Sequence, residues 1–318
     1  GVCGKRSGRF RRVTREKNMT TSIKNKKLEE KILTLAKQKR LNPQELRNIV
    51  DTIKHPSSHP VKDLSAHVKD NQLTIGIISD TCLNSKYARS DILHTAYSFF
   101  KKLKVPYVLH CGNFTERYAK GGEDTLVEHI LHQDYGGMLE HIKEMYPDIG
   151  VPTYFIGGRN ERSFFRRVVK EKDEEGFVWK EKTNVCHDLE DLRDDLNFLG
   201  WHTAKVRIAP KTTLALTSPK NGSRKPYTIS HPIQKIIESY GGGEKPDVQV
   251  VGYYNQRWSG LHLGVNAIMI GTAQNQPPEN YSDAEPSHTL GALVLKFRFK
   301  NGVLTGNGLT EIDVPFYE

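Results

Sequence analysis

The feature that most constrains the fold is a series of short apolar stretches, each followed by a loop of glycine or small polar residues. Stretches of this kind lie at 73–80, 106–111, 153–157 and 247–252, and helix-type patterns lie at 91–104, 124–145, 163–196 and 231–240. Further short strands are expected at 204–209, 212–217, 266–271 and 290–299. Buried strands that alternate with helices are typical of an α/β fold. The sequence therefore predicts an α/β sandwich in which helices flank two sheets.

The first 27 residues differ sharply in charge from the rest of the chain. They hold ten cationic residues and one acid, Glu16, and so carry +9 of the net charge of +10. The cations are Lys5, Arg6, Arg9, Arg11, Arg12, Arg15, Lys17, Lys24, Lys26 and Lys27. A segment with so few apolar residues cannot pack a core, and its charge suits the phosphate backbone of RNA or DNA. We expect residues 1–27 to be a flexible nucleic-acid-binding arm; the alternative is a non-native extension upstream of Met19.

Two further segments separate this arm from the first predicted strand. Residues 28–54 have apolar residues at helical spacing, and Asn42-Pro43-Gln44-Glu45 is typical of a helix start. We interpret 28–54 as a helical hairpin that packs on a neighbour, with a helix-turn-helix fragment as the alternative. Residues 55–72 are rich in Pro, Ser and His and are expected to be a linker, which leaves 73–318 as one domain.

Composition excludes several classes of protein. The chain has no run of about 18 apolar residues, so no transmembrane helix is expected, and its N-terminus lacks an apolar stretch of signal-peptide length. The four cysteines, Cys3, Cys82, Cys111 and Cys186, form neither a disulfide framework nor a CxxC pair for zinc. We therefore expect an intracellular, reducing compartment and no membrane partner.

Small polar residues follow five of the predicted strands. The loops begin Asp80-Thr81-Cys82, Gly112-Asn113, Gly157-Gly158-Arg159-Asn160-Glu161, Ser218-Pro219-Lys220 and Gly252-Tyr253-Tyr254-Asn255. Functional groups of open α/β sheets collect just beyond the carboxyl ends of the strands. We therefore expect these loops to form the candidate site.

The order of these loops resembles that of the calcineurin-like metallophosphoesterase family, and most of all its phage and archaeal-virus branch. The likeness covers residues 70–318 and persists outside the loops, at 192–200, 233–246, 271–274 and in the ending Pro315-Phe316-Tyr317. It implies a metallophosphoesterase-like β-sandwich flanked by helices. In that family two metal ions activate a water molecule and polarise the phosphate.

The chain departs from the family at nearly every position where the resemblance implies a metal ligand. The family's ligands lie in Asp-x-His, Gly-Asp, Gly-Asn-His-Asp/Glu, a lone His and Gly-His-x-His. Asp80 keeps the first acid, whereas the altered positions are Cys82, Asn113, Arg159, Asn160, Ser218, Tyr253 and Asn255. Asn113 lacks the charge of a bridging carboxylate, and Arg159 adds a cation that repels a metal ion. We expect no metal, no cofactor and no catalytic residue, and instead a hydrogen-bonded plug in which Asp80 pairs with Arg159 directly or through one water. The alternative is that Arg159 points to solvent and Asp80 caps a turn or a helix start.

The expected function is that of a non-catalytic pseudo-phosphoesterase, a structural or scaffolding subunit of a nucleic-acid-containing assembly. Its expected partners are RNA or DNA, bound through residues 1–27, and the protein subunits of a viral or ribonucleoprotein complex. Two alternatives remain open. One is a weak metal-dependent phosphodiesterase or nuclease that uses Asp80 with an acid outside the motifs, such as Glu161. The other is a nucleotide- or phosphate-binding module in which Arg159 replaces the charge of the metal.

Overall fold

The structure is a computed structural model of the 318-residue chain. It describes residues 61–117, 128–166, 169–173, 176–180, 183–220, 228–241, 243–277, 287–314 and 316. The chain divides into two compact units, Gly1–Pro60 and Val61–Glu318. The predicted arm at 1–27, the helical hairpin at 28–54 and the linker up to residue 60 lie outside the described residues. Within the described part of the chain, no helix is long and apolar enough to cross a membrane.

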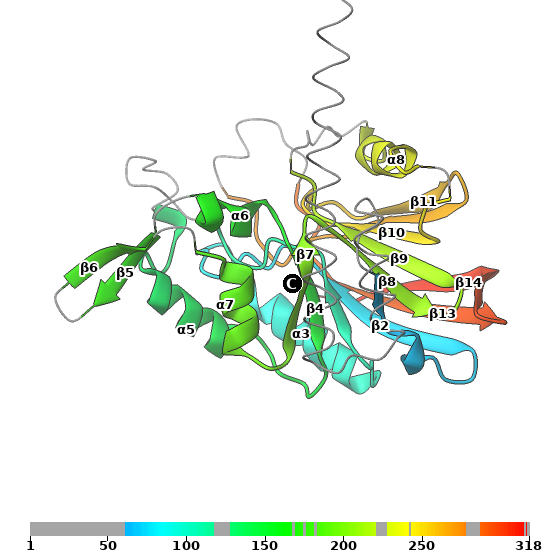
Figure 1. Ribbon diagram of the computed structural model, residues 1–318, viewed down its shortest axis with the longest axis horizontal. Helices are drawn as coiled ribbons and strands as arrows, with labels where there is room; N and C mark the ends of the chain where they lie inside the picture. The colour runs from blue at the N-terminus through cyan, green and yellow to red at the C-terminus, as the bar shows by residue number, and fades with distance from the viewer. Residues whose placement is uncertain are drawn as a thin grey trace, which may run out of the picture. The chain divides into compact units, whose positions relative to one another are not determined.

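Two six-stranded sheets form the core of the second unit (Figure 1). The first sheet is ordered β1 (Val61–Asp63), β8 (Thr203–Ala209), β9 (Thr212–Thr217), β10 (Val248–Val251), β12 (Val265–Met269) and β11 (Trp258–His262). The second is ordered β14 (Val303–Asp313), β13 (Leu293–Lys300), β2 (Gln72–Ile78), β3 (Val108–His110), β4 (Thr153–Gly157) and β7 (Leu196–Trp201). The predicted α/β sandwich is confirmed.

Apolar side chains fill the space between the two sheets. Leu73, Ile75 and Ile77 of β2 belong to one buried cluster with Leu214 and Leu216 of β9. Successive strand residues point to opposite faces, so every second residue of each strand faces the other sheet. This alternation fixes the register of β2 against both of its neighbours.

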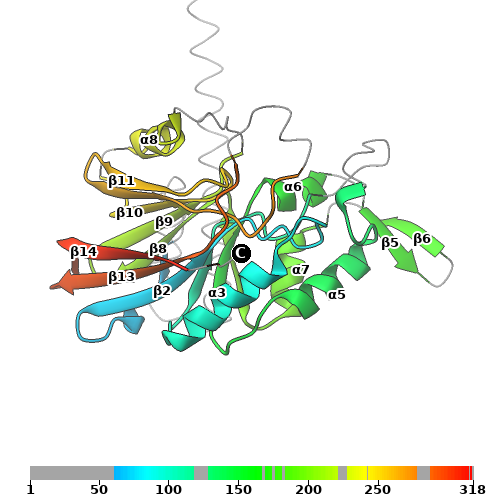
Figure 2. The ribbon, with the colours of Figure 1, turned by 180° about the vertical axis from the view of Figure 1, so that it is seen from behind.

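Helices cover the outer face of the second sheet (Figures 1 and 2). They are α3 (Ser90–Lys102), α5 (Tyr135–Met145), α6 (Arg159–Arg166) and α7 (Val185–Leu192), while α8 (His231–Glu238) packs on the first sheet. Phe100 of α3 lies on Gly76 of β2, where a Cβ atom would come within 2.7 Å of the ring. Only glycine leaves room for this close approach of helix and strand.

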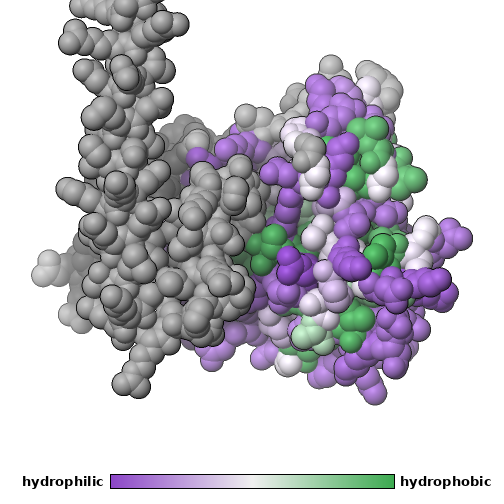
Figure 3. Space-filling view, turned by 45° about the vertical axis from the view of Figure 1, so that its right-hand side comes forward, coloured by the Kyte–Doolittle hydropathy of each residue, from purple (hydrophilic) through white to green (hydrophobic). Residues whose placement is uncertain are grey.

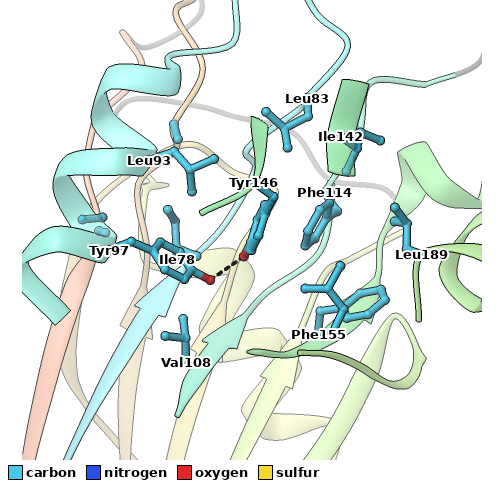
Figure 4. Close-up of a cluster of buried hydrophobic side chains, with 14 of the residues drawn as sticks. Ile78, Leu83, Leu93, Tyr97, Val108, Phe114, Ile142, Tyr146, Phe155 and Leu189 are labelled. Carbon is cyan, nitrogen blue, oxygen red and sulfur yellow. Dashed lines mark hydrogen bonds between the residues drawn. The ribbon is translucent and has the colours of Figure 1, made fainter. Parts of the chain in front are cut away.

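A second apolar cluster lies between these helices and the sheet (Figure 4). The Tyr97 and Tyr146 hydroxyls lie 2.6 Å apart within it, and Tyr97 also bonds to the Thr153 hydroxyl at 2.8 Å. Phe114 stacks on Tyr146 with ring centroids 4.4 Å apart. The hydroxyls of Tyr97, Tyr146 and Thr153 thus have partners, which offsets the cost of removing them from water.

Three predictions about elements need correction. The stretch at 163–196 is not one helix, because the hairpin of β5 (Val169–Asp173) and β6 (Gly176–Lys180) separates α6 from α7. Residues 61–72 are not linker, because β1 pairs in parallel with β8 and Leu64 is buried. Part of the helix expected at 124–145 lies outside the described residues. Residues 130–134 are not helical, and α5 begins at Tyr135, where the carboxylate of Asp134 caps it by accepting the Gly137 N–H at 2.6 Å.

Candidate functional site

The predicted site residues follow the carboxyl ends of strands in both sheets. β2, β3 and β4 are parallel neighbours in the second sheet, and β9 and β10 are parallel neighbours in the first. Hydrogen bonds join the loops after β2, β3, β4 and β10. The structure therefore brings most of the predicted residues together at one edge.

Asp80 lies at the centre of the site and is almost completely buried. Its Oδ2 accepts the Ser79 hydroxyl at 2.5 Å and the Tyr253 N–H at 2.7 Å. Its Oδ1 accepts the Asn113 side-chain amide at 2.7 Å. A buried carboxylate is costly unless hydrogen bonds replace its hydration, and three neutral donors do so here.

Asn113 links Asp80 to the loop after β4. Its amide nitrogen donates to Asp80, while its Oδ1 accepts the Asn160 N–H at 3.1 Å. A carboxylate at this position could only accept, so it would place two anions against each other without a cation. The amide turns this repulsion into a donor–acceptor pair.

Cys82 and Asn160 close the side of the site next to Asn113. The Asn160 amide nitrogen donates to the Thr115 carbonyl at 3.0 Å and lies 3.7 Å from the Cys82 Sγ. The Cys82 N–H donates to the Asn113 carbonyl at 3.0 Å. Two of the positions where the resemblance implies histidine, Cys82 and Asn160, therefore lie in contact.

Arg159 and Tyr253 interact at the surface of the site. The exposed Arg159 guanidinium donates to the Tyr253 hydroxyl at 3.0 Å, and the Tyr253 N–H donates to Asp80. No direct ion pair of Asp80 with Arg159 is found among the described residues, and the exposed position of Arg159 matches the alternative that it points to solvent. The guanidinium stays hydrated, and neutral donors satisfy the buried carboxylate.

Ser218 and Asn255 lie against glycines and a histidine, respectively. Ser218 is fully buried and packs on Gly112 and Gly158, where a Cβ atom would come within 2.8 Å of it. The Asn255 amide nitrogen lies 3.2 Å from Nε2 of His288. No hydrogen bond among the described residues connects either side chain to the carboxylate of Asp80, so they stand apart from its network.

Glu161, which the sequence suggested only as an acid for the alternative phosphodiesterase, binds backbone N–H groups of two loops of the site. Its buried carboxylate accepts the backbone N–H groups of Gly158 at 2.7 Å, Thr115 at 3.0 Å and Asn113 at 3.2 Å. Burial raises its pKa to about 7, against the lowering effect of these N–H groups. A Glu three residues after the residue that caps a helix is the sequence signal for such a bond, and here it joins the loops after β3 and β4.

The loops of the site hold a strained backbone. Asp80, Cys82, Asn113, Tyr253 and Asn255 all have positive φ angles, from 44° to 74°. This conformation is uncommon for residues other than glycine and costs about 1–2 kcal/mol each. Strain of this kind persists only where surrounding contacts enforce it, and four of these five residues are held by the hydrogen bonds above.

The side chains do not fit a pair of metal ions. Asp80 is the only carboxylate among the eight family positions, and both of its oxygens already accept hydrogen bonds. In the described part of the chain, no group of three or more His, Cys, Asp or Glu side chains could hold a metal ion. The site is also tightly packed, since a Cβ atom on Gly252 would come within 2.8 Å of the Cys111 carbonyl oxygen.

Comparisons with known proteins reveal similarity in fold. No family model and no curated protein matches the chain in sequence. An archaeal phosphodiesterase is 14% identical, with 76% of this chain and 99% of that chain covered and a TM-score of 0.40. A predicted phosphoesterase of Streptococcus pneumoniae is 10% identical (76% and 98% covered, TM-score 0.35), and Vps29 of Cryptosporidium parvum is 14% identical (77% and 98% covered, TM-score 0.37). At these identities and TM-scores the likeness carries no conclusion about the family or activity of this chain.

Proposed function

We propose that this chain is a non-catalytic, phosphoesterase-like scaffold of a nucleic-acid-containing assembly, such as a viral or ribonucleoprotein particle. The observation that carries the proposal is the state of Asp80, whose carboxylate accepts from Ser79, Asn113 and Tyr253. A metal ligand or a general base must offer a lone pair to a metal or a proton. Three fixed donors already occupy most of the roughly four lone-pair sites of this carboxylate.

A structural role explains the same contacts. Asp80 follows β2 of the second sheet, and Tyr253 follows β10 of the first. Their hydrogen bond therefore joins the two sheets at the edge where the loops meet. Buried charge-assisted hydrogen bonds of this kind stabilise a fold and fix its geometry.

The nucleic-acid part of the proposal is supported by the charge of residues 1–27. Ten cations in this segment give it +9, and the remainder of the chain is close to neutral. Cations gathered in one segment favour binding to a polyanion, because that binding releases condensed counterions. The other partners in this proposal are protein subunits of the same assembly.

The test measures metal content and hydrolysis together. Purified protein should carry no stoichiometric Mn, Fe or Zn, and should not hydrolyse bis(p-nitrophenyl) phosphate when Mn²⁺ is added. The Asp80→Asn variant should lose stability without any change in this background rate, whereas Asp194→Asn, at an exposed carboxylate, should change neither. Two tightly bound ions per chain, with a hydrolysis rate that disappears in Asp80→Asn, would overturn the proposal.

A further inference from the structure

β13 alternates buried aromatic residues with exposed cations. Phe297 and Phe299 are buried, whereas Lys296, Arg298 and Lys300 are exposed. Residues two apart in a strand share a face and lie about 6.6–6.8 Å apart along it. The three cations, here named the β13 cation row, therefore form a line on one face of the sheet.

No helix among the described residues covers this end of the face. The opposite face of β13 packs on the first sheet through Leu295, Phe297 and Phe299. On the outer face α3 crosses over Gly76 of β2, which pairs with Val294, and the cation row continues beyond that point. Figure 2 shows α3 in front of β2, with β13 and β14 open beside it.

The neighbours of the row across the strands carry no charge. Lys296 pairs with Thr74 of β2 and Thr310 of β14, Arg298 pairs with Gln72, and Lys300 pairs with Val303. None of the three cations forms an ion pair with another described residue. Opposite charges that face each other across two strands stabilise a sheet, whereas like charges in such positions destabilise it.

The acids nearest in sequence are already engaged. Glu311 and Asp313 of β14 pair with Arg257 at 2.5 and 2.8 Å. By register they lie opposite Leu295 and Leu293, which alternate with the cation positions. They therefore do not neutralise the row, which stays available for an anion from outside the chain.

We propose that the β13 cation row binds the phosphate backbone of a nucleic-acid strand. The inference rests on the proposed nucleic-acid role and adds a contact on the folded body to that of residues 1–27. A straight line of cations matches a polymer that carries a charge on every unit, and the forked Arg298 guanidinium suits phosphate oxygens. The flanking Thr74, Gln72 and Thr310 offer neutral hydrogen-bonding groups of the kind that contact phosphate and sugar.

The surface also indicates that this contact is independent of base sequence. Figure 3 shows a face of the molecule on which the described residues are predominantly hydrophilic, with separate hydrophobic patches. The aromatic residues of β13 face the core, so they offer no platform on which bases could stack. Phosphate contacts without base contacts fix position but do not read sequence.

The experiment compares two triple variants of the full chain. One replaces the row (Lys296→Gln, Arg298→Gln, Lys300→Gln), and the control removes the same charge elsewhere (Lys86→Gln, Lys220→Gln, Lys235→Gln), at residues that are also exposed. Binding of fluorescent oligouridylate and oligothymidylate is measured by anisotropy over a salt series. The slope of log K against log salt should fall in magnitude by about two to three for the row variant, at 0.7–0.9 per phosphate contact, and by much less for the control.

Further outcomes separate this inference from the proposed function. If the unaltered chain binds neither oligonucleotide, the proposed nucleic-acid role fails as well. If only replacement of the cations in 1–27 weakens binding, and both triple variants keep the same slope, the row inference alone is overturned. It is also overturned if the row variant loses binding to phosphatidylserine vesicles but not to oligonucleotides. Protection of Lys296 and Lys300, but not Lys86, from acetylation by the bound oligonucleotide would support it directly.

Discussion

At the scale of single residues, Asn113 shows how the site tolerates a buried acid without a metal. Its side chain donates to Asp80 at one end and accepts from Asn160 at the other. The exchange of a carboxylate for an amide changes few atoms but removes one charge and adds a donor. An amide at this position therefore lets a buried carboxylate be held by neutral donors without a cation.

Glu161 leads to a prediction about pH. Its pKa is raised from 4.5 to about 7 by burial, so the folded chain holds this proton more tightly than the unfolded chain does. The free energy of unfolding should therefore fall as the pH rises from about 4.5 to about 7, by an amount on the order of 3 kcal/mol, and then level off. Urea unfolding at a series of pH values measures this slope.

The matched variants for this prediction are Glu161→Gln and Glu140→Gln. Glu161→Gln cannot titrate, so its stability should depend less on pH in this window than that of the unaltered chain. Glu140 is 61% exposed, and its replacement should leave the slope unchanged. Equal slopes for all three proteins would show that Glu161 does not hold a proton in the folded state.

At the scale of elements, the loops after β2, β4 and β10 contribute unequally to stability. Asp80→Asn removes the charge that three buried donors share, so it should lower the free energy of unfolding by about 1–3 kcal/mol. Arg159→Gln removes one exposed hydrogen bond to Tyr253 and should cost less than about 1 kcal/mol.

The double variant tests whether Asp80 and Arg159 interact directly. Because the guanidinium donates to the Tyr253 hydroxyl rather than to the carboxylate, the coupling energy should be below about 0.5 kcal/mol. Urea unfolding of the two single variants and the double variant gives this energy. A coupling above about 1 kcal/mol would restore the ion pair that the sequence had suggested.

The strands that the sequence predicts best are those buried on both faces. Thr153–Gly157 and Thr212–Thr217 have the predicted bounds, because their apolar runs end sharply at polar or glycine residues. β11 and β14 escaped prediction as strands, since both lie at sheet edges and mix exposed with partly buried residues. The many charged residues of 163–196 resemble those of a solvated helix. They concealed the β5–β6 hairpin, in which Val169 pairs with Lys180 and Asp173 with Gly176.

The sequence predicted which residues form the site but not which of their groups form hydrogen bonds with each other. The rule that functional loops follow strand ends is enough to group Asp80, Asn113 and Tyr253. Residue types also suggested a pair between the only acid and the only cation of the set. They could not show that the Tyr253 backbone N–H, held at a φ of 74°, would occupy the position next to the acid.

At the scale of the whole molecule, charge is concentrated in one segment. Residues 1–27 carry +9 of the net +10, so they should dominate non-specific affinity for RNA and DNA. A full-length variant with the ten cations of this arm replaced by Gln should bind oligonucleotides much more weakly and with a flatter salt dependence.

The size of this effect follows from counterion release. Each phosphate contact contributes about 0.7–0.9 to the salt slope, so ten cations set an upper limit of about seven to nine on the loss. If the arm and the β13 cation row contact the same strand at separate phosphates, their losses should add in a variant that lacks both. If the slope of the combined variant falls by much less than the sum of the two separate losses, the two sets of cations compete for the same phosphates. Equal binding by the arm variant and the unaltered chain at low salt would show that the arm does not contact the nucleic acid.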